Sequence, residues 1–182
     1  MGMSLLAASC SQPKEMTLQE GSGWTSRRIY TDFVLTGQAR TEEGAAAAVR
    51  FCVGAPGTGY EVLLQNGPID GTLRTGSLTH VRNLYRSLAQ DGEWFDFSIA
   101  VRGNNIGVQI GGVDVVCYTE PADPWRSEEH AGQRIGPGRI SFEGLKGAVE
   151  LRGLDFERLP AGQRNPADTL PPAGEAGDST IP

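Results

Sequence analysis

EWFDFSIAVRGNNIGVQIGGVDVVCYT, residues 93–119, predicts three consecutive antiparallel β-strands. Over residues 95–101 the odd-numbered residues are apolar and the even-numbered ones are polar or small, which is the two-residue period of a half-buried strand. Two turns follow, at residues 103–105 and 111–112, where glycine and asparagine tolerate the positive φ of tight hairpins. We therefore predict strands over 95–102, 106–110 and 113–119.

The rest of the chain continues this pattern of short strands separated by turns. Its 25 glycines and 11 prolines favour an all-β sandwich or barrel. The segment 80–90 has apolar residues at helical spacing and is either a short helix or an irregular connection. The long loop over 120–137 is expected to border a binding site. Further strands are predicted over 29–40, 47–53, 60–66, 75–79, 138–143 and 149–159, which together make a two-sheet antiparallel β-sandwich.

Composition indicates one domain over residues 23–160, between a signal-like or flexible segment 1–22 and a disordered tail 161–182. A net charge of −6 without a basic stripe argues against nucleic acid as a partner and favours a small polar or neutral ligand. No apolar run approaches the roughly 18 residues that span a bilayer.

The first residues, MGMSLLAASCS, resemble the end of a bacterial lipoprotein signal that stops at a lipidated cysteine, here Cys10. We expect an exported protein, in the periplasm or at the cell surface, with membrane contact through a lipid on Cys10; a cytoplasmic protein is the alternative. Cys52 and Cys117 lie in predicted strands and are expected to be buried free thiols, or a disulfide if the chain is exported. No Cys or His pair has metal-ligand spacing.

Short motifs in a characteristic order connect the chain to a known family. They resemble the 3-keto-disaccharide hydrolase domain, a bacterial family built on the concanavalin A-like jelly roll of many glucanases and lectins. The motifs are YTDFVL (30–35), VRF (49–51), GYEV (59–62), TG (75–76), GEW (92–94), VRGN (101–104), IGGV (110–113), GRI (138–140) and VELR (149–152).

Three positions depart from the pattern of that family. Where the family carries Asn-Ser-Gly before the strand that ends in Arg50, this chain has alanines after Gly44. After the GYE motif, Leu63 and Asn66 stand in place of Gln and Asp. Near the end, the family has Gln and, two residues later, His; this chain has Glu143 and Leu145. The lost histidine would be a natural proton carrier or metal ligand.

The resemblance implies cleavage of a glycoside that is already oxidised to a ketone at C3. The ketone acidifies the C2 proton, so that a base removes it, the C1 leaving group departs by elimination, and water then adds. This chemistry needs a base, a cation or hydrogen-bond donor near the developing enolate, and a proton for the leaving oxygen.

Candidate catalytic residues include Glu61 and Arg50, which meet if the faces that carry them line the same sheet. Alternation places Glu61 and Gln65 on one face of the strand over 60–66 and Arg50 on one face of the strand over 47–53. As hypotheses for this chemistry, Glu61 is the general base or a metal ligand, Arg50 stabilises the enolate, and Glu143, where the family has Gln, is a second carboxylate. A divalent metal is left open as a cofactor. The alternative for Arg50 and Glu61 is a cross-strand ion pair that only stabilises the sheet.

Candidate substrate-binding residues are Gln65 on that face, Trp94 as a stacking platform for a sugar ring, Trp125, and His130 as a substitute for the missing histidine. The alternative for Trp94 is a core or edge anchor.

Two functions therefore stand for a small carbohydrate ligand: hydrolysis of 3-keto-glycosides, or sugar binding by a non-catalytic lectin-like module. A two-carboxylate glycosidase ranks below both, because no Glu-x-Asp-x-x-Glu run lies on a predicted strand.

Overall fold

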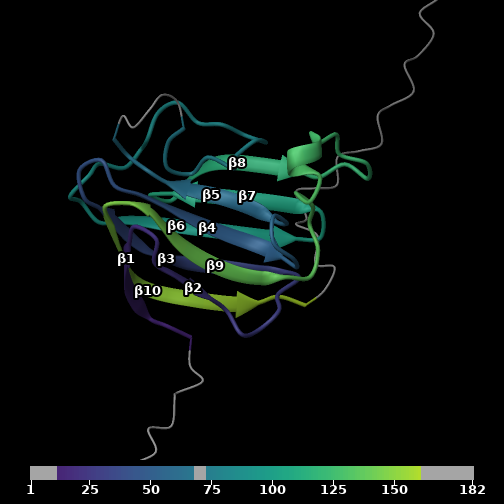
Figure 1. Cartoon of the computed structure of the whole chain (residues 1–182), viewed down its shortest axis with the longest axis horizontal. Helices are drawn as coiled ribbons and strands as arrows, with labels where there is room; N and C mark the ends of the chain where they lie inside the picture. Colours follow the sequence, from purple (N-terminus) through teal and green to yellow (C-terminus); the bar gives the residue numbers. More distant parts are fainter. Residues whose placement is uncertain (1–11, 68–72, 161–182) are drawn as a thin grey trace, which may run out of the picture.

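The computed structural model describes residues 12–67 and 73–160, which form two antiparallel sheets packed face to face. The larger sheet has the order β1-β10-β3-β6-β7-β8 and the smaller sheet has the order β2-β9-β4-β5. Strands of both sheets run in nearly the same direction in Figure 1, which is the aligned packing of a β-sandwich. The strands are β1 (Glu15–Gln19), β2 (Gly23–Thr25), β3 (Phe33–Thr41), β4 (Ala46–Val53), β5 (Tyr60–Leu64), β6 (Phe95–Arg102), β7 (Asn105–Ile110), β8 (Val113–Thr119), β9 (Arg139–Lys146) and β10 (Ala148–Arg158).

The predicted meander is confirmed as β6, β7 and β8, and its boundaries agree with the prediction to within one residue. Odd-numbered residues of β6 are buried and even-numbered residues are exposed or half-buried, as the two-residue period requires. Gly111 and Gly112 both have positive φ, at 58° and 76°, and join β7 to β8. Two consecutive residues with positive φ match the right-handed twist of a hairpin.

The smaller sheet has an irregular edge where the sequence predicts a strand over 75–79. Only Leu78 forms a β-bridge there, to Val62 on β5. The segment still follows β5, because the amides of Thr75, Gly76 and Thr79 donate to the carbonyls of residues 65, 63 and 61 at 2.8–3.0 Å. The backbone of β5 is therefore covered on this side.

The expected start of the domain at residue 23 is wrong, because the sandwich already includes β1. Glu15–Gln19 pairs residue by residue with β10, and β2 pairs with β9. Along β1, Leu18 is buried and Met16 packs against the core. This strand alternates, but it is only five residues long and has just two apolar side chains, Met16 and Leu18, so its signal is weak. Residues 1–11 and the tail 161–182 lie outside the described residues.

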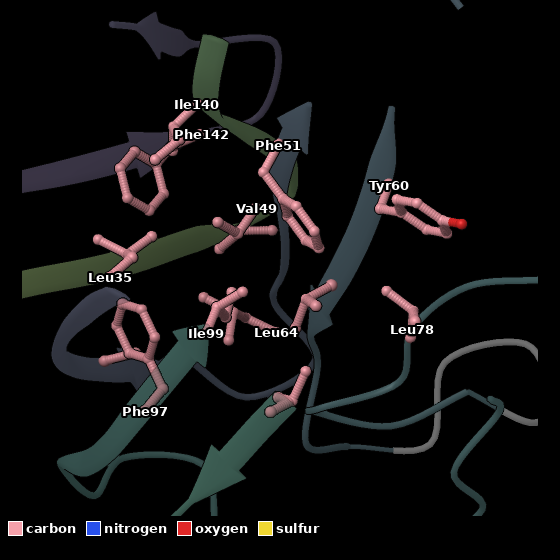
Figure 2. Packing of buried hydrophobic residues seen from close by; sticks show 14 of the residues in the cluster. Leu35, Val49, Phe51, Tyr60, Leu64, Leu78, Phe97, Ile99, Ile140 and Phe142 are labelled. Atoms are coloured by element: carbon pink, nitrogen blue, oxygen red, sulfur yellow. The ribbon is translucent and has the colours of Figure 1, made fainter. Parts of the chain in front are cut away.

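One hydrophobic core fills the space between the sheets. Phe33 of β3 contacts Phe51 of β4 edge to face, with ring centroids 5.9 Å apart, and Phe51 stacks on Tyr60 at the same distance. Figure 2 shows Phe51 and Tyr60 among the packed side chains, with Leu35, Ile99 and Phe142; all five are less than 2% exposed. Burial of each large apolar side chain contributes about 1.5–3 kcal/mol. Packing of this core fixes the two sheets relative to each other, and therefore also the positions of the residues on their outer faces.

Three other expectations are decided by the structure. Residues 80–90 form the irregular connection rather than a helix; the helical element in the described residues is the 3-10 turn η1 (Glu128–His130). Cys52 and Cys117 are both free, and Cys117 is exposed, so the disulfide and the burial of Cys117 are both wrong. No helix within residues 12–67 and 73–160 is long and apolar enough to cross a membrane.

Candidate functional site

Arg50, Glu61 and Glu143 meet on the outer face of the smaller sheet. Arg50 Nε donates to Glu61 Oε2 at 2.9 Å, and Arg50 Nη1 lies 3.0 Å from Glu143 Oε2. The guanidinium therefore bridges carboxylates from two different strands. All three side chains remain accessible, at 44% for Arg50, 24% for Glu61 and 43% for Glu143.

Strand register explains why these residues meet. Arg50 of β4 is directly opposite Glu61 of β5, and on its other side it is opposite Ser141 of β9. Glu143 follows two residues after Ser141, so its side chain leaves the same face of the sheet. Val49 and Phe51, on either side of Arg50 in the sequence, point into the core and anchor β4 against it.

A β-bulge directly after Arg50 ends the regular part of β4. The pairing with β9 shifts between Arg50 and Val53, and Cys52 has a φ of 57°. A Cβ at Gly138 would lie 2.3 Å from the carbonyl carbon of Cys52, so glycine is required for this close approach. Arg50 therefore occupies the last regular position before the strand bends.

Leu145 lies on the same outer face as Glu143, two residues further along β9, and is 37% exposed. It therefore lies next to Glu143, on the side away from Arg50. Gln65 is also near this sheet, but it is buried, and its main-chain amide donates to Thr75 Oγ1 at 2.8 Å. Buried Leu63 separates Gln65 from Glu61, so Gln65 is not part of the charged cluster.

Trp94, the predicted stacking platform, does not lie beside Arg50 and Glu61. It lies on the outer face of the larger sheet, where Arg152 stacks over its ring at 3.9 Å and Arg40 approaches it at 5.0 Å. The alternation along β6 places Trp94 on the outer face with Asp96 and Ser98. Alternation in the sequence correctly predicts which face of β6 carries Trp94. It does not show that β6 belongs to the larger sheet, whereas Arg50 lies on the smaller one.

Trp125 and His130 lie on the loop between β8 and β9, beyond the end of the sandwich. Trp125 is 85% exposed, and His130 stacks on His80 with ring centroids 3.8 Å apart. Figure 1 shows η1 and its loop projecting at this end. The structure thus places both residues off the sheet face that carries Arg50.

A polar cluster fastens that loop to the sandwich. Arg126 Nη2 donates to the hydroxyls of Tyr60 and Tyr118 at 2.9 Å each. Tyr60 in turn donates to Glu120, which also accepts from the amide of Ile135. Burial, followed by the bond to Glu120, raises the pKa of Tyr60, so the phenol stays protonated. The loop is therefore held in place by buried polar contacts.

The described residues do not form a metal centre. Within residues 12–67 and 73–160 no group of three or more His, Cys, Asp or Glu side chains could hold a metal ion. Two of the three charged residues at the cluster are carboxylates, and Arg50 occupies the space between them.

Sequence reasoning missed two features of the outer faces. One is Ser141, whose hydroxyl-bearing side chain lies beside Arg50; counting back by two from Glu143 would have found it. The other is a pair of hollows on the larger sheet, with volumes of about 360 and 420 Å³, neither of which is lined by Arg50, Glu61 or Glu143.

Comparisons with solved structures confirm the fold. A presumed glycosyl hydrolase from Parabacteroides distasonis superposes with a TM-score of 0.71 at 13% identity, over 80% of this chain and 81% of that chain. A carbohydrate-binding module from Bacillus subtilis gives 0.55 at 11% identity, over 76% and 83%. A β-glucanase from Bacillus licheniformis gives 0.51 at 11% identity, over 80% and 78%. These likenesses show the concanavalin A-like glucanase and lectin sandwich.

A search of curated protein sequences gives no match to this chain. The model of the 3-keto-alpha-glucoside-1,2-lyase-like domain matches residues 11–157, which include β1 to β9 and all of β10 except Arg158. The match also covers the whole Arg50, Glu61 and Glu143 cluster. The chain therefore belongs to the 3-keto-alpha-glucoside-1,2-lyase-like domain family.

Proposed function

We propose that this protein cleaves 3-keto-glycosides by elimination followed by hydration. The observation that carries the proposal is the bridging of Glu61 and Glu143 by Arg50 on an accessible sheet face. The family match and the sandwich shared with glycosyl hydrolases support a carbohydrate substrate.

In the proposed reaction the Glu61 carboxylate removes the C2 proton, and the electron pair of that C–H bond forms the enolate at C2 and C3. Guanidinium carries five N–H donors, and two nitrogens face the carboxylates here, so further N–H groups are available for the enolate oxygen. The enolate then restores the C3 ketone, forms a C1–C2 double bond and breaks the C1–O bond.

The leaving oxygen receives the proton that Glu61 took from C2, and the ionised Glu143, across Arg50 from Glu61, is the candidate base for the attacking water. Water then adds at C1 and a proton returns to C2, which gives the free 3-keto sugar. Glu61 thus takes up and releases the proton of the elimination, Glu143 does the same in the hydration, and both end ionised beside Arg50 as they began.

Turnover of a 3-keto-glucoside tests the proposal, with and without added divalent metal. Glu61→Gln should lower turnover by about 10²–10⁴-fold, the usual contribution of a general base. The matched control is Glu150→Gln, since Glu150 forms a similar cross-strand pair with Arg40 on the other sheet. Absence of turnover by the unaltered protein in both conditions would reject the enzyme.

A second candidate function is non-catalytic sugar binding, and Leu145 is the observation that favours it. An exposed leucine beside the charged cluster supplies no proton. If the protein is an enzyme, Leu145→His should raise turnover, because it adds a group that titrates near neutral pH. If it is a binding module, the same change should leave the protein without turnover while the sugar still binds.

We also propose export and lipid attachment at Cys10, which lies outside the described residues. The support is the SLLAASC run that precedes and includes Cys10. Globomycin-sensitive processing at Cys10 in the native host would support the anchor, and a soluble cytoplasmic product would contradict it.

A further inference from the structure

We propose that the outer face of the larger sheet is a second binding site, for a short neutral oligosaccharide. This face is on the opposite side of the sandwich from Arg50, and the inference goes beyond the proposed reaction. The two hollows described above adjoin there, because Ser98 and Gln109 line both of them. Together they form a continuous trough that runs from β3 to β8.

Cross-strand register arranges the trough in two parallel rows. One row is polar and crosses four strands through Ser98, which pairs with Thr36 on β3 and with Gln109 on β7. Gln109 then pairs with Asp114 on β8. With neighbouring strands about 4.8 Å apart, the row spans roughly 14 Å. That length suits several linked sugar rings rather than one small ion.

The second row is small and apolar, which is why the face is hollow. It runs from Val34 through Ala100 and Gly107 to Cys117. A Cβ built on Gly107 meets nothing within 4 Å, so the space above this glycine is open. A floor of this kind exposes flat apolar surface next to the polar row.

Hydrogen bonds within the protein hold the polar groups in fixed orientations. Gln109 Nε2 donates to Asp114 Oδ1 at 2.8 Å. At the other end of the trough Gln38 Nε2 donates to Asp96 Oδ1 at 2.9 Å. Gln38 Oε1 accepts from Arg152 Nε at 2.8 Å, and Arg152 stacks on Trp94. Both amides are therefore oriented before any ligand arrives.

This chemistry fits a carbohydrate better than other ligand classes. A pyranose ring has an apolar C–H face and a rim of hydroxyl groups, which match the apolar row and the polar row beside it. Asp96 lines one hollow and Asp114 the other, and sugar hydroxyls would donate to their oxygens; Arg102 in the second hollow offsets part of their charge, so a neutral ligand fits better than a charged one. The absence of a basic stripe in the sequence also disfavours a nucleic acid.

Titration calorimetry of the full chain with cellotetraose, laminaritetraose, maltotetraose and xylotetraose tests the site. We expect at least one of these probes to bind, and Gly107→Leu to weaken that binding by about tenfold or more because the side chain fills the trough. Gly107 does not have a positive φ, so leucine is compatible with its backbone. If Gly107→Leu fails to fold, Asp114→Ala replaces it and should also weaken binding by about tenfold.

Two controls separate this site from the proposed catalytic face. Glu61→Gln should bind the probe as the unaltered protein does, and Gly107→Leu should keep full turnover of a 3-keto-glucoside. Millimolar concentrations of all four probes without binding would overturn the second site. So would binding that Glu61→Gln abolishes and Gly107→Leu leaves unchanged, since that result places the sugar on the Arg50 face.

Discussion

The two outer faces of this sandwich carry the same kind of ion pair but differ in what surrounds it. On the larger sheet Arg40 pairs with Glu150, directly opposite it on β10. On the smaller sheet Arg50 pairs with Glu61, but a second carboxylate, Glu143, lies 3.0 Å from the same guanidinium. Arg40 instead approaches the ring of Trp94. An ion pair alone is common on a sheet surface. A cation shared by two carboxylates on different strands instead provides the two proton-transfer groups and the cation that the proposed reaction needs.

The largest effect should come from the core that both faces share. Phe51→Ala removes a fully buried ring next to Arg50 and should lower the free energy of unfolding by about 3–5 kcal/mol. Chemical denaturation measures this loss, with Tyr85→Ala as the control, because Tyr85 is 67% exposed. An equal loss in both variants would mean that the core described here does not set the stability.

The pH dependence of stability should report the burial of Cys52 in the smaller sheet. Burial raises the pKa of Cys52 to about 11 from its ordinary 9.0. The unfolded thiol ionises first, so stability is full below about pH 9 and falls as pH rises to about 11, by roughly 2–3 kcal/mol. Unfolding measured across this range checks the loss, and Cys52→Ala should remove that part of it.

Alkylation rates test the difference in exposure between Cys117 and Cys52. Cys117 is exposed on the larger sheet and Cys52 is buried in the smaller one. At pH 8 we expect peptide mass mapping to find Cys117 modified well before Cys52, because reaction needs an accessible thiolate. Equal rates at the two cysteines would contradict the burial of Cys52.

Arg50→Lys against Arg40→Lys tests the difference between the two ion pairs directly. Lysine keeps the charge but loses the planar fork that lets Arg50 face both carboxylates. We expect kcat/KM for a 3-keto-glucoside to fall about tenfold, or about 1.4 kcal/mol, in Arg50→Lys. Arg40→Lys should leave it unchanged, and a similar fall in both variants would remove the special role of the shared cation.

The smallest effect is expected at the Arg40 and Glu150 pair itself. Both side chains are about two-fifths exposed, and such surface pairs contribute about 0–1 kcal/mol. A double-mutant cycle of Arg40→Ala and Glu150→Ala should therefore give a small coupling energy that salt reduces. A coupling well above this range would show that the pair is more than a surface contact.

The sequence predicts the strands that alternate strongly and the residues that such strands place on one face. Parity predicts the face that Glu61 and Arg50 occupy on their own strands, and the structure shows that these strands are neighbours with the two residues directly opposite each other. Trp94 was misplaced because parity along β6 does not reveal which sheet the strand joins. The trough was missed for a related reason: its floor depends on Ala100 pairing with Gly107, a register that no single strand encodes. Small residues also leave little signal, since their contribution is the space they leave open.

The place of β10 in the larger sheet has a consequence for how the chain is made. β10 lies between β1 and β3, so the earliest strand has no partner in its sheet until the latest one is available. Synthesis from the ribosome delivers β10 after every other strand, and contacts so distant in sequence form slowly. The nascent protein therefore stays incompletely folded until its final strand emerges. For a chain that must be threaded through a membrane before it folds, this delay would keep it competent for translocation.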